Sequence, residues 1–260
     1  MLVGAQAFPR GPSVYEIVSK IRQSKFEAIE IVLESPNSVD SFSVEKRERL
    51  KEVLKESGLY STIHAPFSYI DSASPNKDVR KMALVELVET FKIAKAIDAK
   101  IVTVHAPDYR VLLSEILDAY VETISALWSE IKDDGVKLAV ENTMQNYRQF
   151  NRIMERLGNP EIAITYDVGH ANLNGDPIKF LEEIPIERIA NVHLHDNFGS
   201  KDEHLPIGYG RIDFSGVLKT LFKGGYDGLF VVEHYTWLDY PKSEKKLEEL
   251  FKKSSESVVN

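Results

Sequence analysis

Residues 100–141 read KIVTVHAPDYRVLLSEILDAYVETISALWSEIKDDGVKLAVE. A short apolar run rich in β-branched residues at 100–105 is followed by an amphipathic stretch at 114–132 and, after Gly135, by a second apolar run at 137–141. Strand-length runs separated by a longer helical pattern predict a strand–helix–strand unit. A crossover helix of this kind joins strands that run parallel in one sheet.

The same alternation extends through the chain. Further strands are expected at 3–7, 28–33, 60–64, 162–167, 189–193 and 228–233. Helices are expected from Ser13, at 43–57, 77–98, 114–132 and 149–157, from Asp176, and at 213–222 and 243–256. Eight strand–helix units in 260 residues predict an α/β fold, a single (β/α)8 barrel, with a doubly wound open sheet as the alternative. Because no linker marks a boundary, residues 1–260 are expected to form one domain.

The composition narrows the classes of function. The chain is 43% hydrophobic and 28% charged, as in ordinary globular proteins. It has no cysteine, which excludes disulfides, a thiolate zinc site and a cysteine nucleophile. No membrane-length apolar run or signal-like start is present, so we expect a cytoplasmic protein without a membrane partner. The net charge of −8 argues against a broadly basic nucleic-acid surface, although bound metal ions could supply positive charge locally.

Six consecutive predicted strands end in an ionisable residue. These residues are His64, His105, Glu141, Asp167, His193 and Glu233, and His170 follows shortly after Asp167. Any one of them alone is more often structural. The carboxyl ends of barrel strands, however, converge on one rim, which carries the chemistry. Carboxylates and imidazoles without thiolates are ligands for Zn²⁺, Mn²⁺, Fe²⁺, Co²⁺ or Mg²⁺, so the pattern predicts a divalent-metal site.

A long connection, from about Asn197 to Ile212, follows the seventh strand and carries Asp202 and His204. Connections of this length are usually functional. The glycines at 208 and 210 are compatible with a turn or with close approach to a phosphate. Arg211 is compatible with binding of an anionic substrate or with a solvated position on the surface. His195 is expected to point to the opposite face of the strand from His193, and so to support a ligand or to be structural. His234, which follows Glu233, is expected to be structural.

Several motifs resemble the xylose-isomerase-like TIM-barrel superfamily. They are IHAP at 63–66, VH at 104–105, VEN at 140–142, DVGH at 167–170, HLHD at 193–196, DEHLPIGYGRIDF at 202–214 and VVE at 231–233. That superfamily includes sugar and sugar-phosphate isomerases and epimerases, inositol-catabolism enzymes and endonuclease IV, an AP endonuclease. The motif set is specific for the superfamily and much less so for one activity.

Resemblance to the isomerase and epimerase branch implies that one divalent ion (Zn²⁺, Mn²⁺, Co²⁺ or Mg²⁺) is held by Glu141, Asp167, His193 and Glu233. The two glutamates would flank a small sugar, sugar phosphate or polyol and move protons through a metal-stabilised enediolate. In this interpretation His170 binds a substrate oxygen. Further expected substrate contacts are His64, His105 and Arg211.

Resemblance to endonuclease IV implies a rival function, hydrolysis of DNA at abasic sites with up to three zinc ions. All nine ligands of that branch have counterparts: His64, His105, Glu141, Asp167, His170, His193, Asp202, His204 and Glu233. DNA is a partner only in this interpretation. Four departures weaken it. DVGH at 167–170 replaces the nuclease's cysteine-containing stretch, and HLHD replaces its His-x-Asn-Asp. The stretch from His193 to Asp202 is shorter, and dense Arg/Lys loops are lacking. Other metal-dependent lyase chemistry, or binding without turnover, remains a further alternative, and an oligomer is compatible with each.

Overall fold

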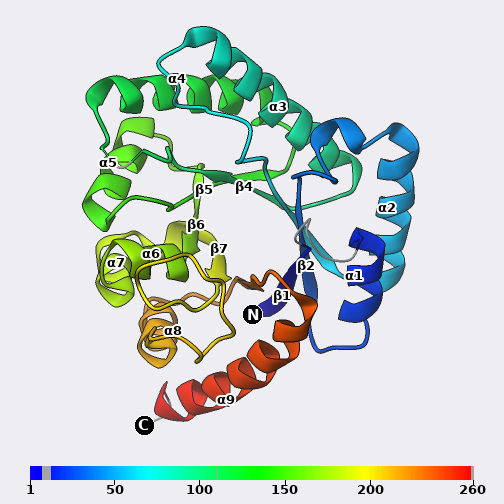
Figure 1. Ribbon diagram of the computed structural model, residues 1–260, viewed down its shortest axis with the longest axis vertical. Coiled ribbons are helices and arrows are strands. Elements are labelled where there is room, and N and C mark those ends of the chain that lie inside the picture. Colours follow the sequence, from blue (N-terminus) through cyan, green and yellow to red (C-terminus); the bar gives the residue numbers. More distant parts are fainter. Residues whose placement is uncertain (8–12, 110, 259–260) are drawn as a thin grey trace.

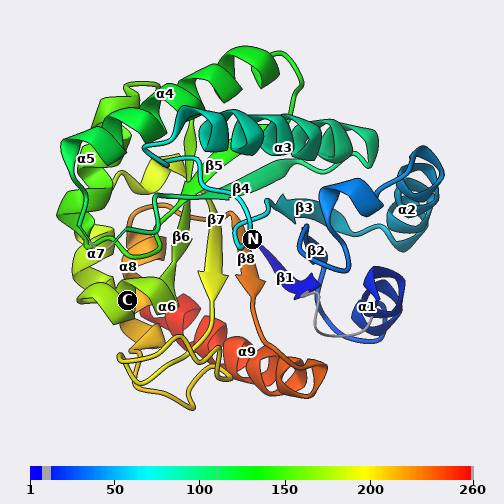
Figure 2. The ribbon, with the colours of Figure 1, turned by 45° about the horizontal axis from the view of Figure 1, so that its top comes forward.

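The computed structural model describes residues 1–7, 13–109 and 111–258 and forms a closed barrel of parallel strands inside a ring of helices (Figures 1 and 2). The strands are β1 (Leu2–Ala7), β2 (Ala28–Val32), β3 (Tyr60–His64), β4 (Ile101–His105), β5 (Lys137–Glu141), β6 (Ala163–Asp167), β7 (Ile189–Leu194) and β8 (Leu229–Val232). Each strand pairs with the next, and β8 pairs with β1. The predicted (β/α)8 barrel is therefore confirmed, and the open-sheet alternative is wrong because no edge remains between β8 and β1.

The helices follow the strands as expected, with one addition. They are α1 (Val14–Ile21), α2 (Val44–Ser57), α3 (Lys77–Ala96), α4 (Ser114–Ile131), α5 (Tyr147–Leu157), α6 (Val168–Asn174), α7 (Pro177–Glu183), α8 (Phe214–Lys223) and α9 (Tyr240–Val258), with short 3-10 turns η1 (Val39–Ser41), η2 (Ile186–Arg188) and η3 (Trp237–Asp239). Helix α6 was not expected, because it starts directly after β6 without an intervening loop. No helix in the described part of the chain is long and apolar enough to cross a bilayer.

Local sequence fixes where the helices begin and end. Ser13 and Glu16 form a reciprocal capping box at the start of α1. Asp176 caps α7, whose first residue is Pro177. Gly58, with φ +68°, ends α2 in the left-handed conformation.

Along β3 to β8 the inward-facing residues change from apolar or uncharged to ionisable toward the carboxyl end. At the floor of the barrel lies a small apolar cluster, Ala28, Ile101, Ala139, Ala163, Leu229 and Val231. Above it Thr103 and Thr165 join across the interior at 2.9 Å between their hydroxyl oxygens. The strand ends above these threonines carry His105 and Asp167. Since side chains repeat every two residues on one face of a strand, this order places the ionisable groups together at the mouth.

Candidate metal centre and active site

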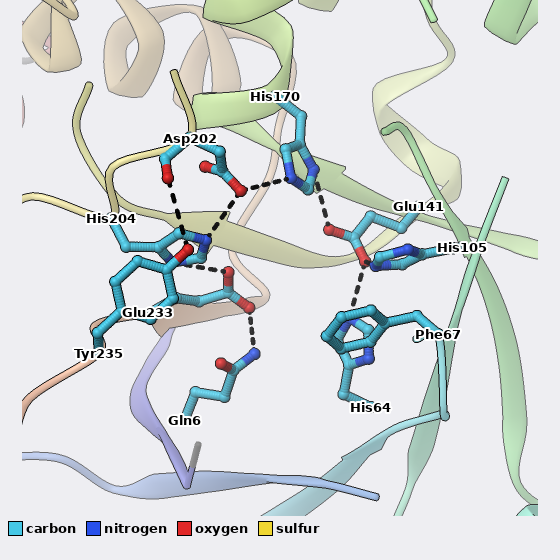
Figure 3. A pocket seen from close by; sticks show the side chains of 10 residues that line it. All are labelled: Gln6, His64, Phe67, His105, Glu141, His170, Asp202, His204, Glu233 and Tyr235. Carbon is cyan, nitrogen blue, oxygen red and sulfur yellow. Dashed lines mark hydrogen bonds and ion pairs between the residues drawn. The ribbon is translucent and has the colours of Figure 1, made fainter. Parts of the chain in front are cut away.

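The strand register brings the polar strand ends side by side. His105 lies opposite Glu141 in the β4–β5 pair, and Asp167 lies opposite His193 in the β6–β7 pair. His105 and Glu141 border a cavity of about 230 Å³ at the carboxyl end of the barrel (Figure 3), whereas Asp167 and His193 are not among the residues that line it. The cavity is lined by Gln6, His64, Phe67, His105, Glu141, His170, Asp202, His204, Glu233 and Tyr235.

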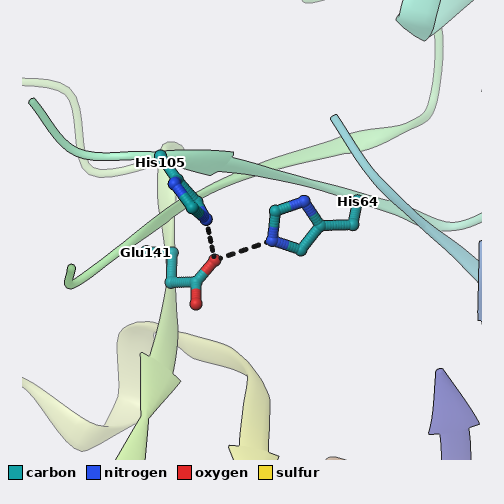
Figure 4. A group of neighbouring side chains, drawn as sticks. All are labelled: His64, His105 and Glu141. Carbon is teal, nitrogen blue, oxygen red and sulfur yellow. Dashed lines mark hydrogen bonds and ion pairs between the residues drawn. The ribbon is translucent and has the colours of Figure 1, made fainter. Parts of the chain in front are cut away.

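Glu141 is the centre of a first group of side chains and is almost fully buried. Its Oε2 lies 3.0 Å from His64 Nε2 and 3.4 Å from His105 Nε2 (Figure 4). Its Oε1 lies 3.2 Å from His193 Nδ1 and 3.4 Å from His170 Nδ1. One carboxylate therefore contacts four imidazoles.

His193 is the centre of a second group, deeper in the barrel. Besides Glu141, its Nδ1 lies 3.0 Å from Glu233 Oε1 and 3.8 Å from Asp167 Oδ2. Its Nε2 lies 3.0 Å from Glu30 Oε1. Oδ2 of Asp167 is buried and has no hydrogen-bond partner. Three carboxylates around one ring nitrogen repel one another unless positive charge lies among them.

Asp202, from the loop between β7 and α8, is the centre of a third group. Its Oδ2 lies 3.2 Å from His204 Nε2 and 3.5 Å from His170 Nε2, and its Oδ1 lies 3.6 Å from His195 Nδ1. His204 Nδ1 lies 3.8 Å from Glu233 Oε2, so this group adjoins the second one.

Burial and neighbouring charge set the pKa values of these residues. Burial lowers the pKa of His64, but its hydrogen bond to Glu141 and the charge of that carboxylate outweigh burial and raise the pKa to about 9. Burial dominates at His105 and lowers its pKa to about 3. Burial opposes ionisation of Glu141, but the surrounding histidines, His193 first, hold its pKa well below its usual range. The site is thus built around an ionised carboxylate.

The donor set fits a divalent cation. Ligand atoms within 4.8 Å of one another occur in overlapping groups, among them His64–His105–Glu141, Glu141–Asp167–His193 and Asp167–His170–His195. Imidazoles and carboxylates without thiolates suit Zn²⁺, Mn²⁺, Co²⁺ or Mg²⁺. Buried polar atoms need partners, and three of the buried side-chain atoms without a hydrogen-bond partner, Asp167 Oδ2 and both ring nitrogens of His195, belong to these groups.

The structure brings together all nine residues that the sequence indicated as ligands, but it places Arg211 elsewhere. Arg211 does not line the cavity; it borders a separate hollow beside Asp176 and Ile178. Its guanidinium lies so close over Gly199 that a Cβ at that glycine would stand 2.3 Å from Nη2. The expected substrate contact of Arg211 is therefore not part of this arrangement.

Three residues of the site escaped sequence reasoning. Gln6 of β1 lines the cavity and donates a short hydrogen bond to Glu233. Glu30 of β2 is fully buried beneath His193. His195 lies 3.3 Å from Asp167 Oδ1 through its Nε2. Its ring fits only because Gly169 has no side chain: a Cβ there would stand 2.0 Å from His195 Cε1.

The glycines of the β7–α8 loop wrap a carboxylate of the chain itself. The buried Asp196 Oδ2 accepts the backbone N–H groups of Gly208 at 3.0 Å and Gly210 at 2.8 Å. Asp196 Oδ1 accepts those of Asn197 at 2.9 Å and Ile212 at 3.2 Å. Of the two interpretations of 208–210, the structure supports the turn. Asp196 thereby organises the loop that carries the third group.

The chain is similar to known proteins over most of its length. The family model described as the xylose isomerase-like TIM barrel matches residues 18–255. An uncharacterized protein of Methanocaldococcus jannaschii is 34% identical, over 95% of this chain and 88% of its own length. A crystal structure of a D-tagatose 3-epimerase-like protein is 32% identical with a TM-score of 0.90, over 99% of this chain and 100% of its own.

More distant relatives are named for different activities. An inosose isomerase of Halalkalibacterium halodurans is 24% identical, over 86% of this chain and 88% of its own length. A probable endonuclease 4 of Mesoplasma florum is also 24% identical, over 82% and 80%. A structure of the IOLI protein with a bound zinc atom shares the fold, with a TM-score of 0.79 at 18% identity over 100% of this chain and 98% of its own.

Proposed function

Because the chain belongs to the xylose isomerase-like TIM-barrel family, we propose that it is a divalent-metal-dependent isomerase or epimerase. The proposed substrate is a small sugar, sugar phosphate or related polyol. The observation that carries the proposal is the pair of glutamates: Glu141 and Glu233 both contact His193 Nδ1, at 3.2 and 3.0 Å, and both line the cavity. In Figure 3 they enter the pocket from opposite sides.

The ion would be held by Glu141, Asp167, His193 and Glu233. When bound, it would polarise the carbonyl and hydroxyl oxygens of an open-chain ketose and offset the charge of an enediolate.

The protons are moved by the two glutamates. One removes the proton from the carbon beside the substrate carbonyl, and the other returns a proton to the opposite face of that carbon, which inverts it. Return of the proton to the neighbouring carbon gives isomerisation instead. Gln6 donates to Glu233 and so fixes the direction of that carboxylate.

His170 is oriented for a substrate oxygen. Its Nδ1 donates to the backbone carbonyl of Asn142 at 3.0 Å, because a carbonyl can only accept. The other ring nitrogen, Nε2, is therefore left for Asp202 or for a substrate hydroxyl in the cavity that His170 lines. This contact would orient the sugar between the two glutamates.

The test is exchange of the proton beside the carbonyl. Metal-loaded protein is incubated with a panel of ketoses and ketose phosphates in ²H₂O, and deuterium incorporation is followed by proton NMR. We expect incorporation that falls at least about 10²-fold in Glu141→Gln and Glu233→Gln. Metal-loaded protein that exchanges no proton of any sugar contradicts the proposal.

A specific observation also favours a second candidate, endonuclease IV-like hydrolysis at abasic sites. The third group, with Asp202 3.2 Å from His204 and 3.5 Å from His170, supplies donors beyond those that one ion needs. Elemental analysis of protein purified without added metal discriminates between the two. About one ion per chain favours the isomerase, whereas two or three, with incision of an abasic-site duplex and no sugar exchange, favour the nuclease.

A further inference from the structure

A buried chain of hydrogen bonds lies behind the cavity, outside the groups that face it. His234 directly follows Glu233, is 2% exposed and does not line the cavity. Its Nδ1 lies 3.0 Å from the carbonyl oxygen of His204, and its Nε2 lies 2.8 Å from Ser243 Oγ in α9. Ser243 Oγ also accepts the N–H of Ile207 at 2.9 Å.

Only one arrangement of protons satisfies every hydrogen-bond donor and acceptor in this chain of hydrogen bonds. The carbonyl oxygen of His204 can only accept, so Nδ1 of His234 carries the proton. Nε2 of the neutral ring then accepts from the Ser243 hydroxyl, whose oxygen accepts from Ile207. His234 thus ties the β7–α8 loop to α9, and Figures 1 and 2 both show these two segments side by side.

The hydrogen bond from His234 holds the backbone of His204. Its φ is +47°, a left-handed conformation that is unfavourable for a residue with a Cβ and persists where surrounding contacts fix it. In that conformation the His204 ring stacks on His195, with 3.9 Å between ring centroids, and its Nε2 lies 3.2 Å from Asp202 Oδ2. The next residue, Leu205, pairs with Asp196 through two backbone hydrogen bonds.

We propose that His234 is a positioning residue: its Nδ1–H holds the backbone of His204 in the conformation that directs the His204 imidazole at Asp202. His234 acts only through His204. The inference rests on the proposed function only to the extent that His204, which lines the cavity, serves the site.

Two amide substitutions separate the two bonds of His234. In His234→Asn the side-chain nitrogen stands where Nδ1 stood, so the bond to the His204 carbonyl is kept and the bond to Ser243 is lost. In His234→Gln the amide reaches the place of Nε2, so the bond to Ser243 is kept and the bond to His204 is lost. The variants are thus matched in chemistry and in the loss of one hydrogen bond each.

The readout is the His204 ring itself, recorded as imidazole ¹H–¹⁵N long-range NMR spectra of the full chain stripped of metal. Wild-type protein should show His234 as the Nδ1–H tautomer. We expect the His204 signals to keep their wild-type shifts in His234→Asn and to move to those of a free imidazole in His234→Gln. An Nε2–H tautomer in the wild type overturns the proposal, as do equal shifts in both variants.

A second readout connects the positioning to the site without any turnover. Zn²⁺ affinity is measured by chelator competition, with His204→Ala as the reference. We expect His234→Gln to reproduce whatever change His204→Ala causes, about 10- to 100-fold if His204 binds the ion, and His234→Asn to match the wild type. The NMR result remains decisive if none of the variants changes the affinity. Absence of sugar exchange by the wild type would refute the proposed function alone.

Discussion

The two halves of the site are held in different ways. Glu141, Asp167 and His193 stand at strand ends, where the closed register of the barrel fixes them. Asp202 and His204 stand on the β7–α8 loop, where hydrogen bonds to single side chains fix them. The strand-borne half (Glu141, Asp167 and His193) cannot shift without opening the barrel. The loop-borne half (Asp202 and His204) can be released by one substitution. We therefore expect the strand-borne residues to carry the proposed chemistry and the loop to be the place where related chains can diverge.

The largest effect is expected in the strand-borne half. Glu141→Gln should lower sugar proton exchange at least about 10²-fold, because in the proposed function it removes both a metal ligand and a proton-transfer group. Glu122→Gln, on the exposed face of α4, is the matched control and should behave as wild type. A Glu141→Gln variant that keeps a tenth of the activity would mean that the chemistry lies elsewhere.

The folded conformation of the loop that carries Asp202 and His204 should depend on Asp196. Asp196→Asn keeps one accepting oxygen but turns an NH₂ group toward backbone donors, and it should cost about 3 kcal/mol of unfolding free energy. The measurement is the shift of the urea midpoint at unchanged slope. Asp213→Asn, at the N-cap of α8, is the control and should cost less than about 0.5 kcal/mol, because asparagine caps a helix about as well as aspartate. Equal costs would refute a loop organised by Asp196.

A substitution at Glu30 tests whether this buried carboxylate orients the ligand His193. Its carboxylate lies 3.0 Å from His193 Nε2 and also accepts hydrogen bonds from Thr62 and Asn191. Glu30→Gln should weaken metal binding about 10- to 100-fold, because an outer partner orients the ligand imidazole. Chelator competition on stripped protein measures this change. Thr62→Val leaves His193 untouched and should cause a smaller loss; the reverse order would contradict the role of Glu30.

The smallest effect is expected at Arg211. Because its side chain borders a hollow separate from the cavity, Arg211→Ala should change kcat/KM for a sugar less than about twofold. Steady-state kinetics with a neutral ketose and its phosphate ester provide the check. A tenfold rise in KM for the phosphate ester would restore the substrate contact that the sequence suggested.

The sequence predicts the strand-borne half well. Each strand is a short apolar run, and the first ionisable residue after it marks the mouth of the barrel, so His64, His105, Glu141, Asp167, His193 and Glu233 could be placed without coordinates. Glu30 escaped because it lies in the middle of β2 and not at its end. Gln6 escaped because an amide does not stand out among histidines and carboxylates.

The loop-borne half was harder to predict. The expectation that His195 points away from His193 was wrong, because residues two apart on a strand share a face and His195 Nε2 lies 3.3 Å from Asp167 Oδ1. The contacts of Asp196 with residues 208–212, and of His234 with His204, depend on tertiary folding of a long loop, for which the chain has no periodic signal. The expectation that His234 is structural agrees with its burial but missed the residue on which it acts.

The close packing of Gly169 against His195 couples two positions that belong to different secondary-structure elements. Replacing Gly169 by alanine puts a methyl group into the space of a fully buried ring, whereas a smaller residue at 195 makes room for it. A double-mutant cycle should therefore show strong positive coupling between Gly169→Ala and His195→Asn. Among relatives of this chain, the two positions should vary together, so that a side chain at 169 predicts the loss of the histidine at 195.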